Sequence, residues 1–94
     1  MSASQWTFLS SHAHVLVVLA REPDLRLRDV AELIGITERA VKRIVRDLHT
    51  AGYLQISKDG RRNHYEYLGS ARLRHRAGNV NATVDDLLEL LQPD

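Results

Sequence analysis

The feature that most constrains the fold is a pair of short amphipathic segments separated by a glycine. Residues 28–34 repeat apolar side chains at the i, i+3, i+4 spacing of one helical face, and Gly35 follows, where a helix commonly ends in a left-handed conformation. Thr37 is a good N-cap for a second helix, which Gly52 would stop. The segment therefore predicts two helices joined by a tight turn. Their apolar faces consist of Val30, Leu33 and Ile34 in the first helix and Val41, Ile44, Val45 and Leu48 in the second.

The placement of small and branched side chains in these segments fits a helix-turn-helix. That motif needs a small residue in its first helix so that the second packs closely, a glycine in the turn, and branched apolar residues in the second helix. Ala31, Gly35, Val41 and Ile44 meet these requirements. The other face of the helix expected over residues 37–52 is polar and cationic, as a helix that enters the major groove of DNA must be. The predicted DNA contacts on it are Thr37, Glu38, Arg39, Lys42, Arg43 and Arg46.

A β-hairpin is predicted directly after the second helix. Apolar and polar residues alternate on both sides of the dipeptide at residues 59–60, an Asp-Gly turn signal. A two-residue turn there pairs Leu54 with Tyr65, whereas a four-residue loop pairs Leu54 with Tyr67. Both registers put the apolar residues on one face. The tip, residues 58–63, is a basic projection expected to contact the DNA backbone or minor groove through Lys58, Arg61, Arg62 and Asn63.

A further helix is expected before the helix-turn-helix. It begins near Ser10 or Ser11, either of which can cap its first turn, and ends by residues 21–22 because Pro23 cannot continue a helix. Residues 25–27 then alternate apolar and basic side chains. This alternation suggests a short strand that pairs with the later hairpin.

The last predicted element is a helix that begins at Thr83, with Asp86 placed to complete a capping box. Its narrow apolar stripe has two interpretations: it folds back on its own domain against Trp6 and Phe8, or it pairs with the same helix of a second subunit. The dimer is favoured because a small domain buries limited surface and because two-fold symmetry doubles the contacts to DNA. The predicted dimerisation residues are Trp6, Phe8, Val84, Leu87, Leu88 and Leu91.

Together these elements predict an α+β fold. A winged helix-turn-helix domain, with a three-helix core and a hairpin wing, spans residues 1–68; a basic connector spans 69–82, and the dimerisation helix spans 83–94. Charge is segregated along the chain. Residues 37–62 carry seven Lys/Arg against three acids, whereas 83–94 carry four acids and no base. A basic segment of this kind is typical of a phosphate-binding face.

Composition excludes several functions. The 94 residues include no cysteine, so disulfides, thiolate metal sites and cysteine nucleophiles are excluded, and a cytoplasmic location is the expectation. The longest apolar stretch, residues 15–20, is far shorter than the roughly 20 residues that span a bilayer, and no secretory signal is recognised. His12 and His14 are two apart and do not share a helical face, which argues against a joint metal site. No catalytic signature is found, so no enzyme activity, metal, cofactor or membrane partner is predicted.

Three runs carry a resemblance to a known class of proteins: ITERAV at residues 36–41, AGYL at 51–54 and GRRNHY at 60–65. With them, residues 12–68 resemble winged helix-turn-helix regulators of the MarR-like and ArsR-like kind. The resemblance implies a homodimer that reads a palindromic operator, usually as a repressor. MarR-type chains are longer, with more helix on each side, and ArsR-type metal sensors commonly use cysteines. By family pattern, Thr37, Glu38, Arg39, Lys42 and Arg43 fall at recognition positions and Arg61 and Arg62 on the wing.

The sequence therefore predicts a homodimeric transcriptional repressor that binds double-stranded DNA. The alternative is a winged-helix module that binds protein through the same surface. A basic helix face is also typical of a merely solvated surface, on which Arg43 and Asp47 would pair at i, i+4. Few aromatics and a short chain argue against a roomy ligand pocket, so a small-molecule effector is not indicated.

Overall fold

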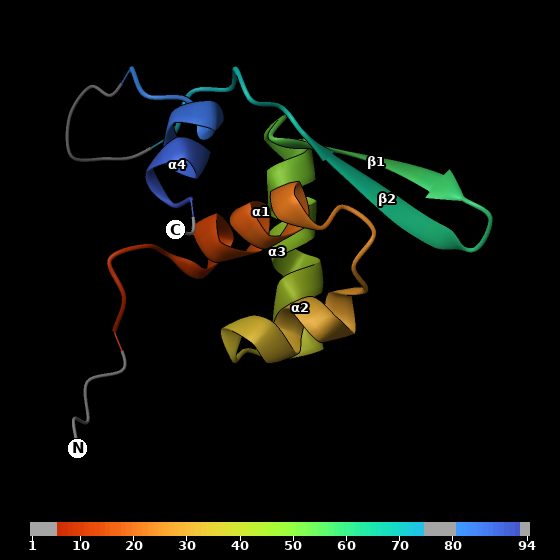
Figure 1. Ribbon diagram of the computed structural model, residues 1–94. Helices are drawn as coiled ribbons and strands as arrows, with labels where there is room; N and C mark the ends of the chain where they lie inside the picture. The colour runs from red at the N-terminus through yellow and green to blue at the C-terminus, as the bar shows by residue number, and fades with distance from the viewer. Residues whose placement is uncertain (1–5, 75–80, 93–94) are drawn as a thin grey trace.

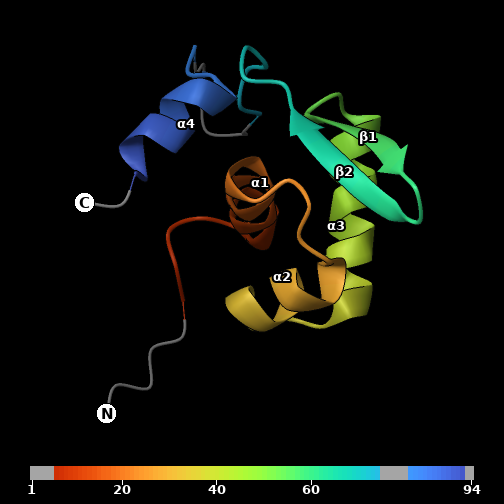
Figure 2. The same cartoon turned by 45° about the vertical axis from the view of Figure 1, so that its right-hand side comes forward.

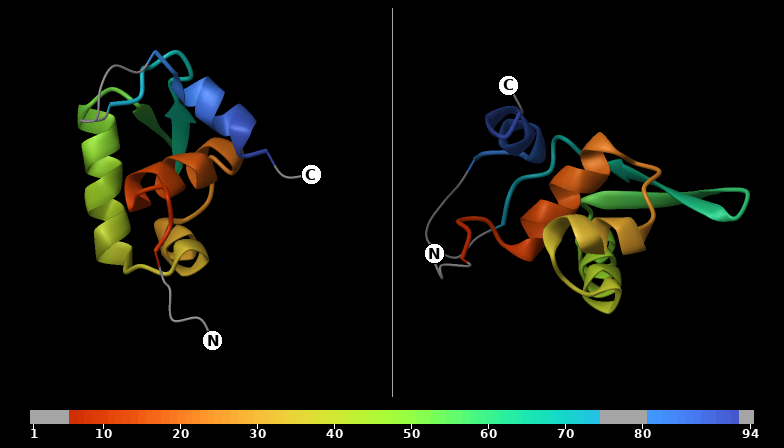
Figure 3. Two further views of the ribbon diagram at one scale, coloured as in Figure 1. Left: turned by 90° about the vertical axis from the view of Figure 1, so that its left-hand side faces the viewer. Right: turned by 60° about the horizontal axis from the view of Figure 1, so that its bottom comes forward.

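The computed structural model describes residues 6–74 and 81–92 and contains, within them, four helices and a two-stranded antiparallel sheet (Figure 1). α1 crosses α3, α2 lies at the N-terminal end of α3, and the hairpin extends away from the helices (Figures 1 and 3). This is the α+β winged-helix architecture that the sequence predicts. In chain order the elements are α1 (Ser11–Arg21), α2 (Leu27–Ile34), α3 (Glu38–Thr50), β1 (Leu54–Asp59), β2 (Arg62–Tyr67) and α4 (Val84–Leu90).

The ends of the first three helices are set by local capping. The Ser10 hydroxyl accepts from the Ala13 N–H at 3.3 Å at the start of α1. Gly35 ends α2 with φ +76°, a conformation that costs an L-residue roughly 1–2 kcal/mol. The Thr37 hydroxyl accepts from the Ala40 N–H at 3.0 Å at the start of α3, a contact typically worth about 1 kcal/mol. These three caps confirm the expected helix boundaries.

The strand expected over residues 25–27 is wrong, because Leu27 is already the first residue of α2. The Arg26 carbonyl accepts backbone hydrogen bonds from the first turn of that helix. A bond from the Tyr65 N–H to the Pro23 carbonyl, 2.9 Å long, joins the preceding loop to β2 instead. The alternation of apolar residues in this segment reflects packing of both leucines against the core, and not a pleated strand.

The hairpin adopts the register in which Leu54 is opposite Tyr67. Pairing continues as far as Asp59 opposite Arg62, so the turn has two residues and begins at Gly60, one residue later than the Asp-Gly signal suggested. Gly60 has φ +66°, and glycine at the first central position is favoured in two-residue hairpin turns. Of the two registers considered, the structure therefore has the one with Leu54 opposite Tyr67, closed by a two-residue turn and not by a four-residue loop.

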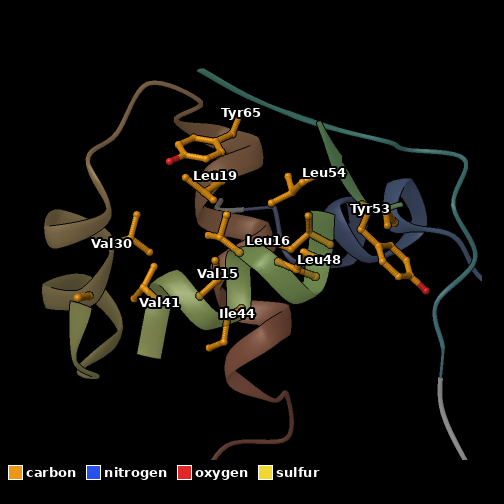
Figure 4. Packing of buried hydrophobic residues seen from close by; sticks show 13 residues of the cluster. Val15, Leu16, Leu19, Val30, Val41, Ile44, Leu48, Tyr53, Leu54 and Tyr65 are labelled. Carbon is orange, nitrogen blue, oxygen red and sulfur yellow. The ribbon is translucent and has the colours of Figure 1, made fainter. Parts of the chain in front are cut away.

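The core lies between α1, α2, α3 and the base of the hairpin (Figure 4). Leu54 and Tyr65 are buried and close this core from the hairpin side, while their cross-strand neighbours on the same face, Tyr67 and Ile56, are each 38% exposed. Residues 58–63 at the tip are all exposed, so the wing extends beyond the helical core. The wholly buried side chains, each worth about 1.5–3 kcal/mol of apolar burial, include Val15, Leu19, Val30, Val41 and Val84.

α4 packs against its own chain. Thr83 and Asp86 form the expected capping box, with the Asp86 carboxylate accepting from the Thr83 N–H at 2.9 Å and the Thr83 hydroxyl accepting from the Asp86 N–H at 3.3 Å. Val84 is wholly buried, Leu88 packs on the core cluster, and the Arg21 side chain donates to the carbonyl of Leu91, the C-cap residue of α4. At least two residues of the apolar stripe, Val84 and Leu88, therefore pack within their own chain, as the fold-back interpretation predicts.

The segments that flank α4 differ in how they pack. The Leu73 N–H donates to the Ala82 carbonyl and the Val84 N–H to the Ala71 carbonyl, both at 2.9 Å, so the ends of the expected connector pair with each other. Residues 75–80 lie outside the described part of the chain. Trp6 and Phe8 are not buried under α4, as the fold-back interpretation would have placed them. Their rings contact each other edge to face at 5.0 Å, and both are largely exposed.

Candidate nucleic-acid interface

The exposed face of α3 carries a row of arginines. Arg39, Arg43 and Arg46 follow the i, i+4, i+7 spacing, which aligns them along one side of the helix. The opposite side of α3 is held in the core against α1 and α2, so this row faces solvent. All the DNA contacts expected on this helix and its cap are exposed: Thr37, Glu38, Arg39, Lys42, Arg43 and Arg46.

The ion pairs formed by α3 residues do not include the arginines of this row. The Lys42 Nζ lies 3.5 Å from the Glu38 Oε2, an exposed i, i+4 pair worth a few tenths of a kcal/mol. Asp47, the candidate partner of Arg43, instead contacts the His12 Nε2 on α1 at 2.8 Å. Within the described residues none of the three arginines of the row forms an ion pair. Their guanidinium groups are therefore available to an external anion or base.

The wing residues divide into two groups. The Arg62 Nη2 donates to the Asp24 carbonyl at 2.9 Å, and the Asn63 Nδ2 donates to the phenol oxygen of Tyr65 at 3.3 Å. These two predicted DNA contacts thus already have partners within the chain. The side chains of the other two, Lys58 and Arg61, are exposed and make no hydrogen bond or ion pair with the described residues.

A second contact fastens the wing to the loop between α1 and α2. The His64 Nδ1 lies 2.7 Å from the Asp24 Oδ1, and this hydrogen bond raises the pKa of His64 above its ordinary value of 6.5. With the Tyr65–Pro23 backbone bond, it fixes the direction of β2 relative to the helices. Sequence reasoning missed the pair because its members are 40 residues apart and carry no local signal.

A groove of about 360 Å³ lies between the wing, the α1–α2 loop and the start of α3. Three of the predicted DNA contacts, Lys42, Arg61 and Arg62, line it, and so does Arg26. Arg26 was missed because its segment was interpreted as a strand. The structure brings these four cations together from three separate segments.

A larger, partly open groove of about 590 Å³ lies between α1, the C-terminal half of α3 and α4. Leu16, Leu48 and Leu87 contribute apolar lining, and His12 and Arg46 are among its polar residues. The expectation that a chain this short leaves no roomy pocket is therefore wrong. Docking of α4 on its own domain creates a wall that sequence patterns did not define.

The described residues contain neither a metal-binding cluster nor a membrane-spanning helix. Residues 6–74 and 81–92 contain no group of three or more His, Asp or Glu side chains placed to hold a metal ion. No helix in that part of the chain is long and apolar enough to cross a bilayer. His12 is engaged by Asp47, while His14 has no acidic partner there.

In a comparison with known families, a sequence model described as MarR family matches residues 6–62. No curated protein matches the chain. Among solved structures, the PcaV transcriptional regulator of Streptomyces coelicolor, crystallised with its natural ligand, is 31% identical with a TM-score of 0.55. The match covers 69% of this chain and 48% of PcaV.

Two more distant structures share the fold. Streptococcus pneumoniae FabT, solved in complex with DNA, is 21% identical with a TM-score of 0.55, and the match covers 70% of this chain and 49% of FabT. The Mycobacterium tuberculosis MarR family protein Rv2887, solved with salicylic acid, is 23% identical with a TM-score of 0.54, over 64% and 47%. The chain thus spans about half the length of these solved relatives.

Proposed function

Because this chain belongs to the MarR family of transcriptional regulators, we propose that it binds a specific double-stranded DNA sequence through α3 and the wing. Members of this family are regulators and not enzymes. The FabT structure, which shares the fold and contains DNA, supports duplex DNA as the partner.

The observation that carries the proposal is the row formed by Arg39, Arg43 and Arg46 on the solvent face of α3. A helix about 10–12 Å in diameter fits a major groove about 12 Å wide. The guanidinium fork matches the O6 and N7 acceptors of guanine, and Glu38 can accept from the amino group of cytosine. These arginines form no ion pair within the described residues, so binding DNA does not require breaking one.

The wing and the start of α3 supply the remaining contacts in this proposal. Lys58 and Arg61 project at the hairpin tip and would lie along the DNA backbone or in the minor groove. Thr37 and the N-terminal end of α3 would face a phosphate, where the helix dipole favours negative charge. Arg62 and Asn63, which have intramolecular partners, would mainly hold the wing in shape.

The proposal includes a homodimer that represses transcription by occupying a palindromic operator. Exposed apolar side chains support self-association: Trp6 is 69% exposed, Phe8 92% and Leu90 82%. Since Val84 and Leu88 pack within their own chain, the interface would use the N-terminal aromatic pair and the outer side of α4. Two-fold symmetry would place the two α3 helices about 34–36 Å apart, one turn of DNA.

A small organic acid is the effector class that the larger groove would suit. Its apolar lining is joined by Arg46, which also belongs to the arginine row, so an acid bound there would compete with DNA for this side chain. The ligand complexes of PcaV and Rv2887 support this part of the proposal. Salicylate at millimolar concentration should raise the melting temperature of the wild type but not of Arg46→Ala. An unchanged melting temperature across aromatic and aliphatic acids would rule this effector class out.

Fluorescence anisotropy tests the DNA proposal directly. Duplexes selected by the protein from a random library would be titrated over a salt series with the wild type, Arg39→Ala/Arg43→Ala and the charge-matched control Arg72→Ala/Arg74→Ala. We expect the α3 variant to lose selectivity among duplexes, since each bidentate base contact is worth about 1–3 kcal/mol. The control should keep that selectivity.

Either of two results would contradict the proposal. If selection enriches no sequence, and binding stays near the ~10⁻⁴ M of non-specific contacts, the chain does not read DNA. If the control variant loses selectivity as much as the α3 variant, the arginine row is not the reading surface. The first result would favour the alternative function, a winged helix that binds an acidic protein through the same face.

A further inference from the structure

The groove between the wing and α3 gathers charge from three parts of the chain. The α1–α2 loop supplies Asp24 and Arg26, α3 supplies Glu38 and Lys42, and the hairpin supplies Arg61 and Arg62. Four cations thus face two carboxylates around a space of about 360 Å³. A groove with this excess of positive charge attracts an anion.

The contacts inside the groove determine which cations remain available. Glu38 pairs with Lys42 at 3.5 Å, and the Asp24 carboxylate is taken by His64 at 2.7 Å. The Arg62 side chain donates to the Asp24 carbonyl. Arg26 and Arg61 therefore remain as the lining guanidinium groups that have no ion pair or hydrogen bond within the described residues.

The groove is held together by contacts that do not involve Arg26 or Arg61. The Asp24–His64 and Arg62–Asp24 bonds, with the Tyr65–Pro23 backbone bond, fasten the wing to the loop that carries Arg26. This pre-positions cations from both segments before a ligand arrives. Such preorganisation lowers the ordering cost of binding.

We propose, building on the DNA-binding function above, that this groove seats a phosphate of the DNA backbone, with Arg26 and Arg61 as its contacts. Guanidinium groups donate two parallel hydrogen bonds to phosphate oxygens, which makes arginine well suited to this ligand. Lys42 lines the groove and also lies on the exposed face of α3, so the groove is continuous with the surface that would enter the major groove. A backbone strand can therefore follow this path while α3 contacts the bases.

Arg26→Ala tests the proposed phosphate site without removing a helix cap. Arg26 is the N-cap residue of α2, but its side chain makes no capping hydrogen bond, and arginine and alanine are both poor caps. Arg28→Ala is the matched control, because Arg28 is exposed on the same helix and does not line the groove. Equal thermal melting of both variants and the wild type would verify that they fold.

The expected result is a sequence-independent loss. Arg26→Ala should weaken binding to selected and unrelated duplexes by the same factor, about tenfold near 0.1 M salt, and reduce the salt slope by about 1. Arg28→Ala should leave both unchanged. If Arg26→Ala binds DNA with the affinity and salt slope of the wild type while Arg39→Ala/Arg43→Ala still loses selectivity, the proposed phosphate site is refuted and the DNA-binding function is not. If the wild type binds no DNA, both the phosphate site and the DNA-binding function are refuted.

A second measurement distinguishes the DNA backbone from free phosphate. Thermal melting without DNA would be compared in inorganic phosphate and in chloride at constant ionic strength. If phosphate raises the melting temperature of the wild type but not of Arg26→Ala, while Arg26→Ala leaves the DNA affinity unchanged, the groove takes free phosphate and its assignment to the DNA backbone is overturned. We expect phosphate and chloride to act equally.

Discussion

The His64 Nδ1 lies 2.7 Å from the Asp24 Oδ1 and thereby ties the wing to the loop between α1 and α2. Figure 2 shows the backbone of this loop, which runs from α1 to α2, and of the hairpin. The same aspartate accepts a hydrogen bond from Arg62 through its backbone carbonyl. One loop residue thus contacts two alternate positions of β2, Arg62 and His64. The angle of the wing depends on this contact as well as on the buried base of the hairpin.

The first prediction concerns pH. Because the hydrogen bond to Asp24 raises the folded-state pKa of His64 above 6.5, its contribution to stability is fully present below pH 6.5 and is lost as pH rises through the raised pKa. The unfolding free energy of the wild type should therefore exceed that of His64→Gln by more at about pH 5.5 than at about pH 8.5. Urea unfolding at both pH values measures this. An equal difference at both would contradict it, and Asp24→Asn should abolish the pH dependence in the same way.

The second prediction concerns the turn before α3. Gly35 has φ +76°, and no atom beyond the adjacent residues lies within 4 Å of the position a Cβ would occupy, so Gly35→Ala introduces backbone strain without a clash. We expect a loss of roughly 1–2 kcal/mol in unfolding free energy. Gly35→Asn should lose less, because asparagine tolerates the left-handed conformation. Equal losses for the two variants would point to a cause other than backbone conformation.

The third prediction concerns the base of the wing. Leu54 is 1% exposed and closes the core from the hairpin side, so Leu54→Ala should reduce the unfolding free energy by about 2–5 kcal/mol. Leu33, which is 64% exposed, provides the control: Leu33→Ala should change it by no more than about 0.5 kcal/mol. Chemical denaturation measures both. A small effect at Leu54 would mean that the hairpin is not docked as described.

The fourth prediction concerns self-association. If the exposed Trp6–Phe8 pair forms part of a homodimer interface, Trp6→Ser/Phe8→Ser should shift the protein from dimer to monomer in sedimentation velocity at micromolar concentration. Leu33→Ser is the control, because Leu33 is a 64% exposed apolar residue on α2. A wild type that sediments as a monomer would refute the proposed dimer. A variant that stays dimeric would place the interface elsewhere.

Much of the fold could be predicted because it depends on neighbours in sequence. Ser10, Gly35 and Thr37 mark helix ends through contacts three or four residues away, and the capping box at Thr83 is equally local. The apolar stripe of α3 likewise determines which side of that helix carries the arginines. Local signals were wrong where they were ambiguous. The alternation at residues 25–27 fitted a strand, but this segment is a loop that leads into α2. The Asp-Gly dipeptide suggested a turn at residues 59–60, but the turn begins at Gly60.

By itself, then, the sequence determined the helices, their caps, the hairpin and the polar face of α3, since these follow from propensity and periodicity over a few residues. Only the tertiary structure decided that Asp47 pairs with His12 rather than Arg43, that Asp24 holds the wing, and that Arg26 shares a groove with Arg61. It also decided that Val84 packs into the core of its own chain. These partners lie far apart in sequence, and their contacts exist only once the burial of apolar side chains has brought the elements together.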